Sequence, residues 1–208
     1  MHPLDCPNWE YENHPQRAVV RLRIAEIISD LASRRIDTLA LATDARPQHL
    51  RVFRELVPLG FDYYAGHYRG EAFRCLRYYS VGVQGDDRVG APPGAVGFLM
   101  SELSSAIRSN VMALDDNVFL SEKDKLRYIV MLACHVFVQL LTIHPYANGN
   151  GHIGRLAVWS IMGRYGYWPY RWPVDPRPPN PPYVQLIMRY RSGEHEPLEM
   201  YMLQMLTA

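Results

Sequence analysis

The chain has little of what would attach it to nucleic acid or to a membrane. Its 22 Lys and Arg residues are balanced by 21 Asp and Glu residues, so no excess of positive charge attracts a polyanion. It contains no run of about 18 apolar residues, the length that a membrane-spanning helix requires. Residues 1–13 are polar and lack the basic and then apolar pattern of a signal peptide. We therefore expect a cytoplasmic protein with no nucleic-acid or membrane partner.

Cysteine is also scarce. The three cysteines, Cys6, Cys75 and Cys134, are odd in number and far apart in the sequence. Their spacing matches neither a zinc site nor the framework of a disulfide-rich domain. We expect all three to be reduced thiols in a cytosolic protein.

Apolar residues, in contrast, make up 48% of the 208 residues, enough for one domain with a sizeable core. They recur at helical spacing through most of the chain, which predicts a mainly α fold. Helices are expected over residues 17–31, 36–42, 49–56, 94–109, 184–190 and 198–206, with two more on either side of residues 144–155.

The helix before residue 144 has the strongest pattern. It opens at a capping box, Ser121-Glu122-Lys123-Asp124, and its apolar residues extend beyond one face. This predicts a central helix that is buried on several sides and ends directly before His144. Residues 77–83 instead favour a strand and residues 85–87 a turn, so we expect one small β-hairpin. Residues 173–182 contain six prolines and predict a connecting loop, with a polyproline ligand as the alternative.

Residues 144–155, HPYANGNGHIGR, combine a base, an anion-binding turn and a cation. The glycines allow a tight turn and a close approach of a ligand to the backbone. The helix that follows presents free N–H groups and the positive end of its dipole, which is a site for phosphate. His144, at the other end of the turn, is able to accept a proton near neutral pH. The segment therefore predicts phosphate binding with base-assisted transfer.

This segment resembles the signature of the Fic/Doc (Fido) family, His-Pro-Phe-x-Asp/Glu-Gly-Asn-Gly-Arg-x-x-Arg. The matching positions are His144, Pro145, Gly149, Asn150, Gly151 and Arg155, and Tyr146 replaces the phenylalanine. Two positions depart from the signature. Asn148 stands where the family has an acidic residue that holds magnesium, and His152 stands in place of the first arginine.

The resemblance continues in the same order outside the motif. Residues 61–69 look like the family's aromatic, Ala-Gly and Tyr-Arg segment, and residues 91–103 look like its Pro-Pro segment and the following helix. Residues 133–143 resemble the helix before the motif, and residues 193–198 resemble the usual ending. We therefore expect an N-terminal extension with one helix at residues 1–34, and a Fic-type helical bundle with a small β-hairpin flap at residues 35–208.

The resemblance implies transfer of AMP, or a related phosphate-linked group, from a nucleotide such as ATP to a Ser, Thr or Tyr hydroxyl of a protein. His144 would be the general base for that hydroxyl, with a helix cap as the alternative role. The nucleotide would be bound by Gly149, Asn150, Gly151, His152 and Arg155. The target would add to a flap at residues 78–90 as an extended strand. A glycine turn without a ligand, a surface arginine and a plain surface hairpin are the alternatives.

Asn148 and His152 weaken this chemistry. A neutral amide oxygen holds Mg²⁺ less firmly than a carboxylate and leaves the ion to phosphate and water. An imidazole carries a positive charge only when it is protonated beside phosphate. We therefore keep a second hypothesis, a catalytically impaired module that binds nucleotide or a partner. A third is a helical scaffold without nucleotide affinity.

Two weaker patterns complete the sequence. His135, His144 and His152 have spacings that match no zinc or iron site. Ser192 and Glu196 have the spacing of the family's inhibitory helix, but Pro197 follows and the segment coincides with the usual ending. We do not assign an inhibitory helix, and a separate inhibitory partner protein stays open.

Overall fold

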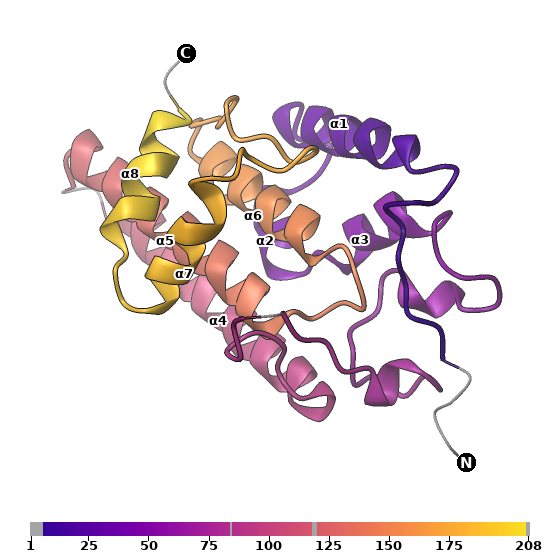
Figure 1. Ribbon diagram of the computed structural model, residues 1–208. Coiled ribbons are helices and arrows are strands. Elements are labelled where there is room, and N and C mark those ends of the chain that lie inside the picture. The colour runs from indigo at the N-terminus through magenta and orange to yellow at the C-terminus, as the bar shows by residue number, and fades with distance from the viewer. Residues whose placement is uncertain (1–5, 84, 118–119, 207–208) are drawn as a thin grey trace.

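The computed structural model describes residues 6–83, 85–117 and 120–206, and these residues form a bundle of helices (Figure 1). Residues 1–5 of the predicted extension and residues 207–208 of the predicted Fic-like region lie outside them. The helices are α1 (Ala18–Ala32), α2 (Thr38–Thr43), α3 (Arg46–Phe53), α4 (Pro93–Asp116), α5 (Glu122–Ile143), α6 (Asn150–Arg164), α7 (Tyr183–Arg191) and α8 (Glu196–Gln204). Two 3₁₀ turns, η1 (Asp62–Tyr64) and η2 (Leu76–Tyr78), precede α4.

The predicted mainly α fold is confirmed. The capping box opens α5 as predicted, because Ser121 Oγ accepts a hydrogen bond from Asp124 N at 3.1 Å. Helix α4 is longer than its apolar pattern suggested and continues to Asp116. Residues 173–182 form a loop that connects α6 with α7, in agreement with their proline content.

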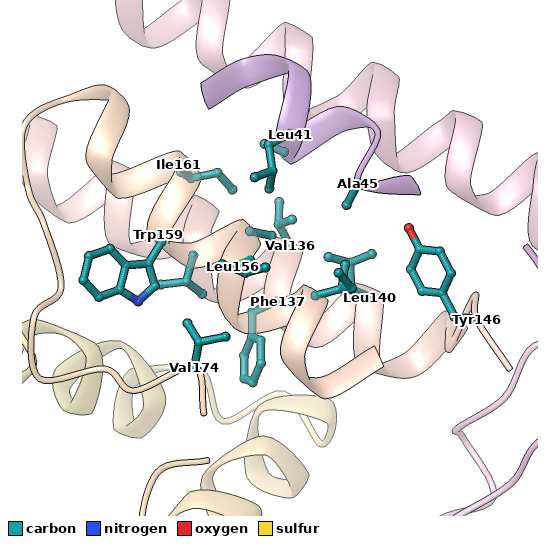
Figure 2. Packing of buried hydrophobic residues seen from close by; sticks show 14 of the residues in the cluster. Leu41, Ala45, Val136, Phe137, Leu140, Tyr146, Leu156, Trp159, Ile161 and Val174 are labelled. Carbon is teal, nitrogen blue, oxygen red and sulfur yellow. The ribbon is translucent and has the colours of Figure 1, made fainter. Parts of the chain in front are cut away.

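Helices α5 and α6 pack against each other at the centre of the bundle. Helix α2 covers α6, α4 lies along α5, and α7 and α8 cover another side of α5 (Figure 1). Figure 2 shows Phe137 and Leu140 of α5 beside Leu156 of α6. Gly154 of α6 permits this close contact, since a Cβ atom there would lie 3.1 Å from the Phe137 ring. The α5–α6 pair therefore fixes the ends of the turn between them, residues 144–149.

Helix α5 is also, within the described part of the chain, the one helix long and apolar enough to cross a membrane. In the fold 56% of its most apolar window is buried. Such burial is typical of the core helix of a globular domain.

The predicted β-hairpin is wrong for the described residues, which contain an isolated bridge between Val83 and Asp86 and no strand. Gln84, inside the expected hairpin, lies outside these residues. The β-prone residues begin in the turn η2 instead, and the following segment is fixed by charges. Asp86 is buried and binds Arg88 Nε at 2.7 Å and Arg191 of α7 at 2.8 Å. Arg88 and then Arg191 lower the pKa of Asp86 to about 2.

The expectation of three reduced thiols is also wrong. Cys6 and Cys75 form a disulfide, while Cys134 is free and buried in α5. The pairing joins residues 69 positions apart, which local spacing rules do not detect. Cys6 begins a stretch, residues 6–17, that runs past α3 into α1 (Figure 1) and that we call the N-terminal segment.

The N-terminal segment belongs to the main core. Trp9 is 2% exposed and donates its Nε1–H to the Leu56 carbonyl at 2.7 Å. Tyr64 donates its hydroxyl to the Pro7 carbonyl at 3.1 Å. Helix α1 then packs on α3 and α6. The described part of residues 1–34 therefore shares one core with the rest, and a domain boundary after residue 34 stays a prediction.

Thiol counting tests the pairing of Cys6 with Cys75. In denaturant without a reductant, we expect one thiol per chain, that of Cys134, and three after reduction. Reduction should also lower the free energy of unfolding by about 2–4 kcal/mol, because the cross-link restricts the unfolded chain. Three thiols in the unreduced protein would restore the original expectation.

Candidate active site

His144 ends α5 in a left-handed conformation, with φ of 54°. Its backbone N–H donates to Leu140 O at 2.9 Å, and its Nδ1–H donates to Leu141 O at 3.2 Å. Because Nδ1 carries the proton, Nε2 has a free lone pair. Burial lowers the pKa of His144 below its usual value, so the imidazole is neutral at pH 7. His144 is therefore prepared to accept a proton.

Arg69 holds the backbone around His144. It is 1% exposed, and its side chain and backbone N–H donate to five carbonyl oxygens at 2.7–3.0 Å. These acceptors belong to Ile143, His144, Pro145, Tyr79 and Ala91. The first three end α5, and the last two flank the segment 80–90. Burial lowers the pKa of Arg69 to about 10. One cation thus links the base to the segment where the flap was expected.

Asn150 closes the turn between α5 and α6. Its amide oxygen accepts from Tyr146 N, and its amide nitrogen donates to Tyr146 O, both at 2.9 Å. The Tyr146 ring stacks on His49 with centroids 3.9 Å apart. His49 in turn accepts from Gly66 N and donates to Asn148 O. The Asn150 side chain is therefore used within the turn, and what it offers a ligand is its backbone N–H.

The N-terminus of α6 has unpaired backbone donors. Gly149 turns the chain with φ of 79°, which a residue with a Cβ rarely adopts. In the part of the chain that the structure describes, no hydrogen bond uses the backbone N–H of Asn150 or Gly151. Together with the helix dipole, these two N–H groups form the kind of site that binds phosphate.

Arg155 lies one turn into α6 and is 4% exposed. Its Nε–H donates to Val174 O at 2.8 Å, and Nη1 donates to the Tyr183 hydroxyl at 3.3 Å. Within the described ranges no carboxylate lies at ion-pair distance from it, so its charge is not neutralised. The alternative of a surface arginine does not hold, because the side chain is buried.

His152 is enclosed by residues from two distant segments. Its Nε2–H donates to Asp175 Oδ1 at 3.1 Å, and its Nδ1 accepts from the Tyr11 hydroxyl at 3.0 Å. Asp175 also binds Arg17 at 2.7 Å, and His152 and Arg17 hold the Asp175 pKa well below its usual value. Burial lowers the pKa of His152 despite the attraction of Asp175. His152 is therefore neutral, with both ring nitrogens occupied.

Asn148 is also fully engaged. Its Nδ2 donates to the Trp9 carbonyl at 2.6 Å, and its Oδ1 accepts from Gly149 N at 2.7 Å. The first bond connects the turn to the N-terminal segment across 139 positions of sequence.

A sequence model described as the Fic/DOC family matches residues 47–162, which include the whole turn and most of α6. The match covers more than half of the 208 residues. The chain belongs to the Fic/DOC family. Members of the Fic/DOC family generally transfer AMP or similar groups to proteins, which makes this chain a candidate transferase. Among curated proteins none matches the chain.

The side chains at the motif do not fit the magnesium ion that the Fic resemblance implies. Mg²⁺ prefers charged oxygen ligands, whereas Asn148 is neutral and both of its polar atoms are already bonded. Within the described ranges no group of three His, Cys, Asp or Glu residues is placed to hold a metal. Among the described residues, the side chains of the motif therefore offer no carboxylate for a resident cation.

The structure thus brings the sequence-predicted residues together around one turn. The side chains of Asn148, Asn150 and His152, however, bond to other residues of the chain instead of being free for a ligand. The groups without a described partner are Nε2 of His144 and two N–H groups of α6. The guanidinium of Arg155 lies against Gly151, with two of its nitrogens already bonded. Sequence reasoning assigned no role to Arg69, although it quoted the Tyr68-Arg69 pair. It also missed the contacts of Trp9, Tyr11 and Asp175, which lie in segments with no local motif.

Proposed function

We propose that this chain transfers AMP, or a related phosphate-linked group, from a nucleotide donor such as ATP to a Ser, Thr or Tyr hydroxyl of a target protein. One observation carries the proposal: a neutral His144 with a free Nε2 and a helix N-terminus with two unpaired N–H groups stand at the two ends of one short turn. A base and an anion site on one turn are what hydroxyl activation and phosphate binding require.

The reaction follows from these groups. The target hydroxyl gives its proton to Nε2 of His144, and its oxygen attacks the α-phosphorus. The bond from the α-phosphorus to the bridging oxygen breaks, and pyrophosphate leaves when ATP is the donor. The N–H groups of Asn150 and Gly151 stabilise charge on the phosphate, and Arg155 binds the outer phosphates. His152, being neutral, contributes little charge.

Cofactor, partners and location belong to the same proposal. Any Mg²⁺ at this site would arrive with the phosphates and water instead of being held by Asn148. The target protein would lie along residues 80–90, and a separate inhibitory protein remains open. We propose no role for nucleic acid or a membrane. A cytoplasmic location is part of the proposal, and the Cys6–Cys75 disulfide counts against it, since disulfides are rare in reducing compartments.

The second candidate function is a nucleotide-binding or interaction module with impaired catalysis. The engagement of Asn148 with Trp9 and of His152 with Tyr11 and Asp175 favours it, because neither side chain is free for phosphate or metal. Such a module binds nucleotide without transferring a label, and it keeps its function after His144→Ala.

Label transfer tests the proposal. With α-phosphate-labelled ATP, Mg²⁺ and host lysate, the chain should label a protein, and His144→Ala should reduce labelling about 100-fold or more. His195→Ala, an exposed histidine at the start of α8, should leave labelling unchanged.

The pH dependence of labelling is a second readout of His144. Because only neutral imidazole accepts the proton and burial lowers its pKa below 6.5, labelling should be constant from pH 7 to 8. It should fall as the pH drops below 6.5. Absence of label from ATP, GTP, CTP and UTP would exclude nucleotidyl transfer and leave either transfer of another phosphate-linked group or the second candidate.

A further inference from the structure

We infer that Asn148 holds the N-terminal segment in place of a divalent cation, so that nucleotide binds at the α6 N-terminus without Mg²⁺. The nucleotide part of this inference rests on the proposed function, whereas the role of Asn148 does not.

The first observation is the geometry at Asn148. Its Nδ2 lies 2.6 Å from the Trp9 carbonyl oxygen, and Trp9 itself is immobilised. The Trp9 backbone N–H donates to the Tyr79 hydroxyl at 3.1 Å, and its ring is buried against Leu56. A carboxylate at position 148 would place a negative oxygen against this fixed carbonyl. Only a donor is accommodated there, and an amide supplies one.

The second observation is that the other departure from the Fic signature contacts the same segment. His152 accepts from the hydroxyl of Tyr11, two residues after Trp9. The two substituted positions of the motif are therefore both paired with residues 9–11. This pairing explains the identity of Asn148 and His152 by contacts within the chain, and it leaves neither as a ligand of magnesium or phosphate.

The third observation concerns charge. The positive groups at the turn without a described carboxylate partner are the α6 N-terminus, Arg155 and Arg69, and the donors of Arg69 are taken by carbonyls. The first two need no bridging cation to meet a phosphate. Arg17 is the next cation, but Glu12 at 2.8 Å and Asp175 at 2.7 Å use it. Asp175 remains ionised, yet His152 and Arg17 occupy its oxygens. No described carboxylate is thus free to hold Mg²⁺ at the turn.

The first test measures the thermal stability of Asn148→Asp in EDTA. We expect Tm to fall by about 5 °C or more, because a buried donor is lost and a charge faces the Trp9 carbonyl. Asn110→Asp is the matched control, since Asn110 Nδ2 also donates to a carbonyl, Ala106 O at 2.8 Å, but on the exposed face of α4. It should change Tm by less than 2 °C. An unchanged Tm for Asn148→Asp would overturn the role of Asn148.

The second test is calorimetric titration of the wild-type chain with ADP, and with GDP, CDP and UDP in parallel, in Mg²⁺ and in EDTA. We expect binding in EDTA that Mg²⁺ does not strengthen. Binding that is fivefold or more tighter in Mg²⁺ would overturn the inference. If no nucleotide binds in either buffer, the proposed function and the nucleotide part of the inference both fail, and the thermal test still decides whether Asn148 holds Trp9.

Discussion

The Arg69→Met variant is expected to lose about 4 kcal/mol of unfolding free energy. The substitution leaves the carbonyls of Ile143, His144, Tyr79 and Ala91 without their side-chain donor in a partly buried site, where Ile143 O keeps a bond from Ala91 N at 3.1 Å. Each buried carbonyl without a donor costs about 1–3 kcal/mol. Removal of the buried positive charge is favourable and offsets part of this total cost. Burial lowers the pKa of Arg69 to about 10, so removal of this charge belongs in the balance.

Urea denaturation of Arg69→Met and Arg108→Met measures this cost. Arg108 is an exposed arginine of α4 whose described bond is to Thr43 Oγ1 at 3.1 Å, and its replacement should cost less than about 0.5 kcal/mol. The loss of unfolding free energy for Arg69→Lys should lie between those of the other two variants, because an ammonium keeps the charge but cannot reach four acceptors in one plane. A loss below 1 kcal/mol for Arg69→Met would mean that water reaches these carbonyls.

The second large effect is expected for Gly149→Ala, with a loss of about 3 kcal/mol. The left-handed backbone of Gly149 costs about 1 kcal/mol for alanine. The new Cβ would also lie 2.5 Å from Phe53 Cε2, and relief of this overlap requires the turn or α3 to shift at a cost of about 1–3 kcal/mol. A shift of the turn moves the N–H groups at the start of α6.

Gly166→Ala separates the two contributions. Gly166 has φ of 84°, close to that of Gly149, and no heavy atom within 4 Å of an added Cβ. Its substitution should therefore cost only the backbone strain, about 1 kcal/mol. Equal losses for the two variants in urea denaturation would exclude a collision with Phe53.

Much of the fold followed from the sequence because helices are encoded locally. The helical period of apolar residues predicted α1, and the capping box at Ser121 predicted the start of α5. The hairpin failed because β-prone tyrosines were weighed without the distant Arg191, whose contact with Asp86 shapes that segment. The prediction of three reduced thiols was wrong for the same reason, since no local rule connects Cys6 with Cys75.

The candidate site was predicted to the same extent: its groups were found from the sequence, and their hydrogen-bond partners were not. The motif at residues 144–155 brought His144, the turn and Arg155 to one place, because these groups are adjacent in sequence. Their hydrogen-bond partners are not adjacent. Trp9 is 139 positions from Asn148, and Tyr11 is 141 positions from His152. A sequence therefore reveals which groups meet in this turn but not which of them are already occupied.

The contacts of the N-terminal segment have a consequence for how this chain is able to evolve. Asn148 is coupled to Trp9, and His152 is coupled to Tyr11. An acidic residue at position 148 would meet a fixed carbonyl, and an arginine at position 152 would have to displace a buried tyrosine. Each single substitution toward the family signature is therefore expected to lower stability as long as Trp9 and Tyr11 keep their positions. We expect these positions to change together among relatives of this chain, because a substitution at one of them alone breaks a contact that the other partner still requires.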